Sequence, residues 1–430
     1  MLPDKQPLFI PDPIRRLIDQ LNGSGFACFV VGGYLRDLIL QRPTHDYDLA
    51  TSATPEQVAE VFSSYRTIPT GLAHGTMTVI AGEETVEVTT FRKEGSYSDF
   101  RHPDEVWFTG SIEDDLARRD FTINAMAWHP EQGLIDPWDG RADLEGRLIR
   151  AVGEAEKRFE EDALRVLRAL RFSSELGFEI EPSTRRALGK ASHLLQHIAP
   201  ERIRIEMERL LAGPNLADVL DTYAPVMAEA IPVLAALQST QAGGDESLYE
   251  IAIKRMANVS PDPLKRMAAL LYDIGEASRA DTAASVAQAL RFSKKDTENI
   301  SLLVASKTEE MAQDERAVWR LLRRWGESSF SEVMEIRTAD ARARYAGDKG
   351  RQAIIEAVGR VAEDLIAAGR NLSLADLAVD GRDLIKRGFR GPAIGSRLES
   401  LLEAVCVDGI ANRKDTLLKE LDRLDAEIQA

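Results

Sequence analysis

Alternating hydrophobic and polar positions are concentrated in the first 150 residues of the chain. The predicted strands are Ala27 to Val31, Tyr47 to Ala50, Thr76 to Ile80 and Thr85 to Phe91. Between these strands, the hydrophobic residues of Thr54 to Phe62 are spaced as in a helix. From about Lys157 onward the pattern becomes helical, rich in Leu, Ala, Arg and Glu, and is interrupted by glycines and prolines. The pattern therefore predicts an α/β head followed by an all-helical remainder.

The stretch Phe29 to Thr51, FVVGGYLRDLILQRPTHDYDLAT, has the features of a phosphate site. Gly32 and Gly33 follow the first predicted strand directly, so the backbone can turn there and approach a ligand closely. A short helix is predicted from Tyr34 to Leu40. Its unpaired amide groups and positive dipole end would point at the glycine loop, and Arg36 would add a full charge. This arrangement favours a polyphosphate ligand.

Two carboxylates follow within the same stretch. Asp46 and Asp48 flank Tyr47, and residues two apart on a strand project from the same face. Two carboxylates on one face form a hard-oxygen site for a magnesium-like ion. Glu87 would offer a third carboxylate if its strand neighbours theirs, and an exposed edge-strand glutamate is the alternative. A phosphate loop beside a metal pair predicts phosphoryl or nucleotidyl transfer.

Arg118, Arg119 and Asp120 stand together at the start of a predicted helix. Guanidinium groups bind phosphate oxygens in bidentate fashion, and a carboxylate can accept hydrogen bonds from ribose hydroxyls. Taken alone, such a group is more often a surface salt-bridge cluster.

A charged stripe is predicted on a helix that includes Glu161 to Phe172. The members of the stripe recur every third residue and are Asp162, Arg165, Arg168 and Arg171. A carboxylate that accepts from an exocyclic amino group, beside a guanidinium that donates to a ring nitrogen, pairs with cytosine and adenine and rejects uracil and guanine. Asp162 and Arg165 are spaced for this selection. A solvated i,i+3 ion pair is the alternative.

Composition limits the remaining possibilities. The chain has 430 residues and a net charge of −16, so any nucleic acid must be held by a local basic surface. The sequence has neither a signal-peptide pattern nor an apolar run long enough to span a bilayer. Cys28 and Cys406 are predicted to be buried reduced thiols. These features predict a cytoplasmic protein without a membrane partner, and they leave the oligomeric state open.

Together these motifs resemble those of class II tRNA nucleotidyltransferases, the bacterial CCA-adding enzymes and their poly(A) polymerase relatives. The resemblance is carried, up to about Leu211, by GGYLRD, DYD, TGLAHGTMTV, EVTTFRKEGSYSDFRHPDEV, DLARRDFTINAMA, LIDPWDG and EDALRVLRALRFSSELGF. It implies a polymerase-β-like head with a mixed sheet at residues 1–150 and a neck with the nucleotide-selecting helix at 151–213. A helical body at 214–330 and a helical tail at 331–430 would hold the tRNA.

The resemblance also implies roles for individual residues. Asp46 and Asp48 would bind Mg²⁺, and the predicted catalytic set adds Glu87 to them. Asp120 matches the family position near the ribose. The predicted nucleotide-binding residues are Gly32, Gly33, Arg36, Arg119, Asp120, Asp162, Arg165, Arg168 and Arg171. The implied activity is template-independent addition of C, C and A to the 3′ end of tRNA from CTP and ATP, by a mechanism in which Asp46 and Asp48 hold two Mg²⁺ ions.

Enzymes that add only CC, enzymes that add only A, and poly(A) polymerases share these motifs. Arg92 to Asp104 is expected to be a mobile loop and resembles the full-length flexible loop, which CC-only enzymes typically have in shortened form. Gly75-Thr76 and the mixed-charge tail Asn412 to Ala430 differ from poly(A) polymerases of this class. A-only addition, as the partner of a CC-adding enzyme, stays open. A non-catalytic RNA-binding descendant would be expected to lose a metal carboxylate or the Asp162/Arg165 pair, and this sequence keeps both.

A segment in the second half, Ala268 to Gly275 (AALLYDIG), resembles the His-Asp segment of HD-type phosphohydrolase domains. Tyr272 stands where the histidine ligand would be, and all six histidines of the chain precede it. We therefore expect a degenerate HD-like body with a structural role and no histidine metal site.

Overall fold

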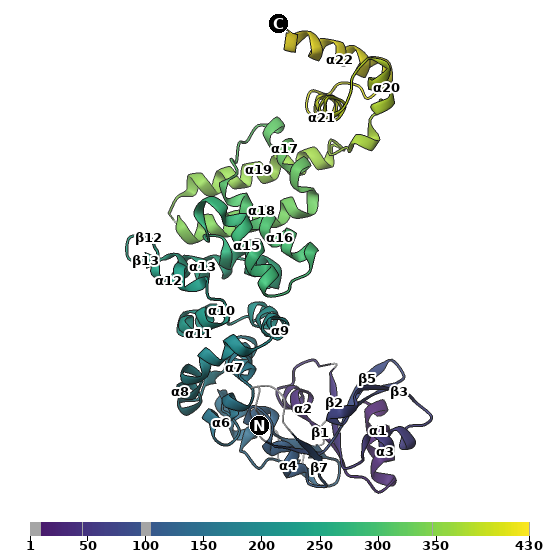
Figure 1. The fold of residues 1–430 in the computed structure, drawn as a ribbon, viewed down its shortest axis with the longest axis vertical. Coiled ribbons are helices and arrows are strands. Elements are labelled where there is room, and N and C mark those ends of the chain that lie inside the picture. Colours follow the sequence, from purple (N-terminus) through teal and green to yellow (C-terminus); the bar gives the residue numbers. More distant parts are fainter. Residues whose placement is uncertain (1–9, 45, 96–104, 346, 430) are drawn as a thin grey trace. The chain divides into compact units, whose positions relative to one another are not determined.

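The computed structural model describes residues 10–44, 46–95, 105–345 and 347–429. The chain divides into two compact units, one extending to Ala235 and the other starting at Ala236 (Figure 1). Most of the loop predicted at Arg92 to Asp104 lies outside the described residues, from position 96 onward. Among the helices that the structure describes, none has the length and apolar character needed to cross a membrane.

A seven-stranded sheet with the strand order β3-β4-β5-β2-β1-β8-β9 forms the centre of the head. Its strands are β1 (Cys28–Val31), β2 (Tyr47–Thr51), β3 (Arg66–Gly71), β4 (Thr76–Ala81), β5 (Glu84–Thr90), β8 (Ala127–His129) and β9 (Gly133–Ile135). β2 and β5 run parallel, whereas the other neighbours are antiparallel. The predicted mixed sheet is therefore confirmed, with the four strands expected from the alternation as β1, β2, β4 and β5.

β1 is buried along its whole length because side chains cover both faces of the sheet. Phe29 and Val31 pack against Leu116 of α4 (Ile112–Ala117). α1 (Asp12–Gly23) also contacts β1 and turns four apolar side chains into the core. This burial fixes the end of β1, from which the glycine turn leaves the sheet.

Helices complete the first unit. They are α2 (Gly32–Ile39), α3 (Pro55–Val61), α5 (Gly140–Gly146), α6 (Ala155–Glu161), α7 (Leu164–Leu176), α8 (Pro182–Ala191), α9 (Pro200–Ala212), α10 (Leu216–Thr222) and α11 (Ala224–Ala230). Two short ribbons pair β6 (Arg92–Glu94) with β7 (Val106–Phe108), and β10 (Leu148–Ile149) with β11 (Glu179–Ile180). α7 packs along α9, so side chains from both helices can meet at one site.

The second unit is helical apart from a ribbon of β12 (Gln241–Gly243) and β13 (Glu246–Ser247). Its helices are α13 (Leu248–Met256), α14 (Pro263–Leu271), α15 (Arg279–Ala289), α16 (Lys294–Ala305), α17 (Glu315–Trp325), α18 (Glu327–Arg344), α19 (Lys349–Ala367), α20 (Gly381–Lys386), α21 (Pro392–Cys406) and α22 (Lys414–Gln429). α12 (Leu234–Ser239) spans the division between the units. Cys28 and Cys406 are buried free thiols, as predicted.

The HD-like segment contains a buried charge cluster. Tyr272 is fully buried, and the Asp273 carboxylate pairs with Nη2 of Arg255 at 2.5 Å and also with Lys307 and Arg344. Because these cations surround the carboxylate, its contacts are those of a structural group, which agrees with the expected structural role.

Candidate active site

Gly32 begins α2 immediately after β1, with a φ of +67° that glycine adopts without steric cost. A Cβ atom at this position would lie 3.0 Å from both Oδ2 of Asp48 and Nη1 of Arg119. The helix predicted from Tyr34 thus starts on the glycines themselves. No side chain caps its first turn, so the amide groups there are oriented for an anion.

The paired carboxylates lie at β2, and β5 runs beside it with Glu87 opposite Asp48. Burial raises the pKa of Asp48 to about 6; the nearby charges of Glu87 and Asp46 add to this rise, while Arg119 and Arg36 oppose it. A divalent cation would relieve this accumulation of negative charge. The donor set of Asp46 and Asp48 therefore fits a hard metal ion.

Glu87 is exposed and does not line the pocket that contains Asp46 and Asp48. Within the described part of the chain, no three His, Cys, Asp or Glu side chains are grouped to hold a metal ion. The strand that carries Glu87, β5, lies beside β2 as expected. A role for Glu87 as a third carboxylate stays a prediction.

A series of hydrogen bonds joins α2 to α7 through the short turn η2 (Thr122–Asn124). Nη1 of Arg36 donates to Oδ1 of Asn124 at 2.8 Å, and Nδ2 of Asn124 donates to Oδ1 of Asp120 at 3.2 Å. Oδ2 of Asp120 accepts from Nε and Nη2 of Arg168 at 2.8 and 2.5 Å. Burial alone would raise the pKa of Asp120, but the charge and hydrogen bonds of Arg168, with the Asn124 bond, hold it well below its usual value.

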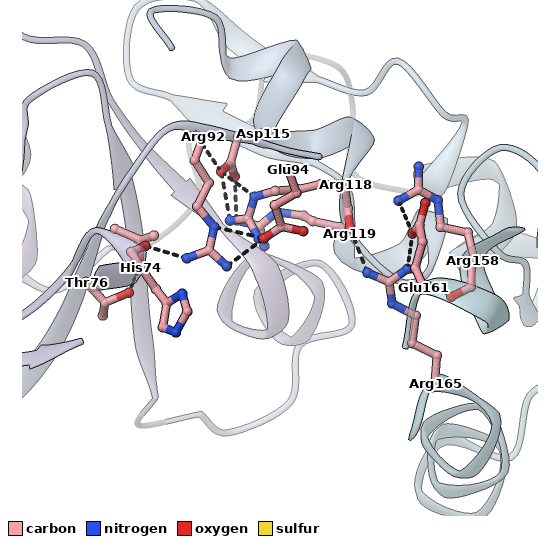
Figure 2. Close-up of polar contacts among 11 residues, drawn as sticks. His74, Thr76, Arg92, Glu94, Asp115, Arg118, Arg119, Arg158, Glu161 and Arg165 are labelled. Atoms are coloured by element: carbon pink, nitrogen blue, oxygen red, sulfur yellow. Dashed lines mark hydrogen bonds and ion pairs between the residues drawn. The ribbon is translucent and has the colours of Figure 1, made fainter. Parts of the chain in front are cut away.

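Arg118 and Arg119 follow the end of α4, so their predicted place at a helix start is wrong. The apolar run after them enters the sheet as β8 beside β1, which leaves room only for the short η2 turn. Both arginines pair with the buried carboxylate of Asp115, at 2.8 Å for Arg118 and 3.1 Å for Arg119 (Figure 2). Figure 2 also shows Arg118 paired with Glu94 of β6, at 3.2 Å.

The structure breaks the helix that was predicted to include Glu161 to Phe172. Asp162 has an extended conformation between α6 and α7, and its Oδ1 accepts from the backbone N–H of Leu164 at 3.1 Å. This local side-chain bond, made two residues along the chain, competes with helix continuation. Nη2 of Arg202 on α9 donates to Oδ2 of Asp162 at 2.8 Å. Asp162 therefore pairs with Arg202, and not with Arg165 in the i,i+3 ion pair that the sequence offered as the alternative.

Arg165 is held from three sides (Figure 2). Its Nη1 donates to Oε2 of Glu161 at 2.7 Å and to the carbonyl oxygen of Arg158 at 3.0 Å. Its Nη2 donates to the carbonyl oxygen of Arg118 at 3.2 Å. These bonds connect α7 with the segment that follows α4.

Three arginines surround the ring of Phe172. Arg171 lies 4.1 Å from the ring centroid, Arg36 5.1 Å and Arg168 5.6 Å. Nη1 of Arg171 also pairs with Oε2 of Glu206 at 3.2 Å. The aromatic face and the carboxylate together keep closely spaced guanidinium groups in one place.

These groups line one pocket of about 500 Å³, to which eight arginines and six carboxylates contribute. The pocket is thus locally positive in a chain of net charge −16. The predicted residues that it brings together are Gly32, Gly33, Arg36, Asp46, Asp48, Arg119, Asp120, Asp162, Arg165, Arg168 and Arg171. Sequence reasoning missed Asn124, Arg202 and Arg209 as pocket residues. For Asn124 a signal existed, because it follows Asp120 within the same polar motif.

Comparison with protein families places three models along the chain. A poly(A) polymerase head domain matches residues 28–150, and a probable RNA- and SrmB-binding site of polymerase A matches residues 177–223. Domain 2 of tRNA nucleotidyltransferases matches residues 265–421.

The chain is also similar to curated proteins named CCA-adding enzymes. The CCA-adding enzyme of Lactobacillus delbrueckii subsp. bulgaricus is 36% identical over 421 residues, which cover 94% of this chain and 96% of the relative. The CCA-adding enzyme of Geobacillus stearothermophilus is 49% identical over 213 residues, which cover 50% and 51% of the two chains. The similarity is therefore higher in a segment of about half the chain than over its whole length.

A solved structure agrees with these relatives. The crystal structure of the Bacillus stearothermophilus CCA-adding enzyme in complex with CTP has a TM-score of 0.76 and 30% sequence identity, and the match covers 98% of this chain and 99% of that one. From its fold, its pocket and these similarities, the chain belongs to the family of CCA-adding enzymes, which are tRNA nucleotidyltransferases.

Proposed function

We propose that this chain adds C, C and A to the 3′ end of tRNA, using CTP and ATP and no nucleic-acid template. The observation that carries the proposal is the single pocket in which the carboxylates Asp46 and Asp48 meet the base-reading candidates Asp162 and Arg165. In the reaction, the tRNA 3′-hydroxyl oxygen bonds to the α-phosphorus, the bond from that phosphorus to the β-phosphate oxygen breaks, and pyrophosphate and a proton are released.

Members of this family are nucleotidyltransferases that use divalent metal ions. We propose that two Mg²⁺ ions are bound, with Asp46 and Asp48 as their ligands and Glu87 as the third carboxylate of the catalytic set. When bound, the ions would neutralise phosphate charge and favour the ionised hydroxyl. The raised pKa of Asp48 supports the assignment, because burial disfavours the ionised carboxylate and a bound cation would stabilise it.

The remaining residues position the nucleotide. Amide groups of the Gly32-Gly33 turn, with Arg36 and Arg119, are proposed to bind the triphosphate, and Arg119 has a buried Nε without a hydrogen-bond partner among the described residues. Asp120 accepts hydrogen bonds at both oxygens, from Phe121 N–H and Asn124 at one and from Arg168 at the other. A ribose contact by Asp120 therefore requires the release of one present donor.

Base selection is assigned to Asp162 and Arg165, with Arg168 and Arg171 as further base or phosphate contacts. Asp162 supplies only acceptors and Arg165 only donors, which matches the amino group and ring nitrogen shared by cytosine and adenine. Uracil and guanine present the reverse pattern, so both polar groups of the site would be left unpaired.

For the domains we propose a head at 1–150, a neck at 151–213, a body at 214–330 and a tail at 331–430. The body and tail would bind the tRNA through its shape and backbone, as suits an A-form acceptor stem. The family models for a probable RNA-binding site and for tRNA nucleotidyltransferase domain 2 support an RNA role for the later segments. The proposed substrates favour a cytoplasmic location.

A test uses tRNAs that end before CCA, after the first C and after CC, each offered one NTP at a time with Mg²⁺. We expect CTP to be used on the first two and ATP on the third. Use of ATP alone, with refusal of CTP on the shortest tRNA, would identify an A-only enzyme. Long adenosine runs would identify a poly(A) polymerase, and absence of any product would contradict the catalytic assignment.

A further inference from the structure

A residue from another helix fixes the base-reading carboxylate. Arg202 of α9 donates from Nη1 to Oδ1 of Asp162 at 3.2 Å and from Nη2 to Oδ2 at 2.8 Å. This fork-shaped pairing is the geometry in which a guanidinium group orients a carboxylate most firmly. Arg202 lines the same pocket as Asp162.

The hydrogen bonds of Asp162 leave little freedom for a ligand. A carboxylate offers about four lone-pair directions. Oδ1 accepts from Leu164 N–H and from Nη1 of Arg202, and Oδ2 accepts from Nη2 of Arg202. One direction is left, on Oδ2. A single acceptor of fixed direction matches the exocyclic amino group that cytosine and adenine carry beside a ring-nitrogen acceptor, where uracil and guanine carry a carbonyl beside a ring N–H.

Arg165, the donor partner, is restricted in a similar way. Both N–H bonds of its Nη1 are used by Glu161 and the Arg158 carbonyl, and one from Nη2 is used by the Arg118 carbonyl. The carboxylate and the guanidinium are therefore both held before a nucleotide binds, which lowers the cost of ordering them on binding.

Without Arg202, the Asp162 carboxylate would turn more freely about its last side-chain torsion, which has a broad energy minimum. A turned carboxylate can accept from the ring N–H of uracil or guanine as well as from an amino group. We infer, on the basis of the function proposed above, that Arg202 is a positioning residue that holds Asp162 in the orientation that selects CTP and ATP over UTP and GTP.

The same helix supports the rest of the selecting surface. Glu206, one turn after Arg202 on α9, pairs with Nη1 of Arg168 at 3.5 Å and with Nη1 of Arg171 at 3.2 Å. Two successive turns of α9 therefore make charged contacts with α7 and with Asp162, which lies between α6 and α7. Arg202 is the member of this series that acts on the carboxylate proposed to read the base.

The test measures kcat/KM for CTP and for UTP with the full chain and a tRNA that ends before CCA. Arg202→Gln removes the charge and the fork, whereas Arg202→Lys keeps the charge but offers a single ammonium group. Arg204→Gln is the matched control, because Arg204 lies on the same helix and pairs with Glu208 at 2.9 Å. We expect Arg202→Gln to lower the CTP-to-UTP ratio of kcat/KM about tenfold or more. Arg202→Lys should lower the ratio in the same direction, and the control should retain the wild-type ratio.

An unchanged ratio in both Arg202 variants would overturn the inference. Equal losses with CTP and UTP would overturn it as well, since they would show a general structural role. Circular dichroism checks the fold; if Arg202→Gln is unfolded, Arg202→Lys decides, and unfolding of both variants would also reject a positioning role. If the wild-type protein itself adds no nucleotide, the proposed function is contradicted. Failure of the proposed function is thereby distinguished from failure of the positioning role of Arg202.

Discussion

Arg168 donates through Nε and Nη2 to the same carboxylate oxygen of Asp120, at 2.8 and 2.5 Å, and so connects α7 to the segment that carries Arg119. The pair is separated by 48 positions in the sequence. Because Asp120 also accepts from Asn124, the position of Arg36 depends on this contact too. Arg36, proposed to bind the triphosphate, and Arg168, proposed to contact the base or a phosphate, are thus parts of one polar network.

Asp120→Asn should destabilise the first unit. Charge-assisted hydrogen bonds to Arg168 would be lost, and we expect the free energy of unfolding in urea to fall by about 2 kcal/mol at pH 7. Since the pKa of Asp120 lies well below its ordinary value, its contribution is present above the unfolded-state pKa of about 4 and is lost as pH falls through the folded-state pKa. The variant and the wild type should therefore converge only in strong acid.

Glu156→Gln is a suitable control for Asp120→Asn. Glu156 pairs with Lys190 at 2.6 Å, but its side chain is 61% exposed. Solvent screens a surface pair of this kind, so Glu156→Gln should leave the free energy of unfolding nearly unchanged. Equal effects of the two substitutions would show that the Asp120 contact has no special weight.

Gly32→Ala should abolish nucleotide addition. The new Cβ would sit 3.0 Å from Asp48 and Arg119, and the positive φ adds strain of about 1 kcal/mol. Gly133→Ala is the control, because Gly133 has a φ of +77° and nothing within 4 Å of the added Cβ. Both variants should lose stability through the positive φ, and only Gly32→Ala should lose activity in a tRNA-extension assay. Full activity of Gly32→Ala would refute the close approach at the glycine turn.

Asp48→Asn should stabilise the metal-free protein at alkaline pH while abolishing activity. The folded-state pKa of Asp48 is raised to about 6, so its contribution to stability is present below the unfolded-state pKa and is lost as pH rises through 6. In EDTA at pH 8 we expect the variant to be more stable than the wild type by about 1 to 2 kcal/mol, with the difference vanishing near pH 4.

Metal addition provides the counterpart to that experiment. Mg²⁺ should raise the thermal midpoint of the wild type at pH 8 and leave that of Asp48→Asn nearly unchanged, because an ion that binds the folded state stabilises it by mass action. The metal assignment would be contradicted if the wild type were more stable than Asp48→Asn in EDTA at pH 8. It would also be contradicted if Mg²⁺ raised the thermal midpoint of Asp48→Asn as much as that of the wild type.

Arg255→Met should weaken the second unit. The Arg255 side chain is fully buried and pairs with Asp273 at 2.5 Å and Asp340 at 2.7 Å, so its removal leaves two carboxylates with fewer partners. We expect a loss of about 3 kcal/mol in urea unfolding. Lys294→Met, at a surface pair with an N–O distance of 3.8 Å, should change stability by less than about 0.5 kcal/mol. A similar small loss for Arg255→Met would contradict a structural role for the cluster.

The features that sequence reasoning predicted are those with local signals. Alternation identified β1, β2, β4 and β5, and the strand-to-glycine junction located the turn at Gly32. The spacing of Asp46 and Asp48 was sufficient to place both in the pocket, although Asp46 directly precedes β2 and only Asp48 belongs to the strand. In each case the signal and the structure that it predicts lie within a few residues of one another.

The features that were missed depend on contacts between distant segments. Arg202 pairs with Asp162 across 40 positions, which only the packing of α9 on α7 makes possible. The helix break at Asp162 was missed because the residues around it have strong helical periodicity, whereas one side-chain bond to Leu164 decides the local conformation. At Arg118, pairing of the next segment with β1 overrode the apparent helix start.

The most direct test offers a tRNA that ends before CCA to the wild-type protein, with all four NTPs and Mg²⁺ together, and sequences the 3′ ends of the products. The pocket built from Asp46, Asp48, Asp162 and Arg165 predicts ends that read CCA, with UTP and GTP excluded. Unextended tRNA, uridine or guanosine at the new positions, or adenosine added without preceding cytidines would contradict it.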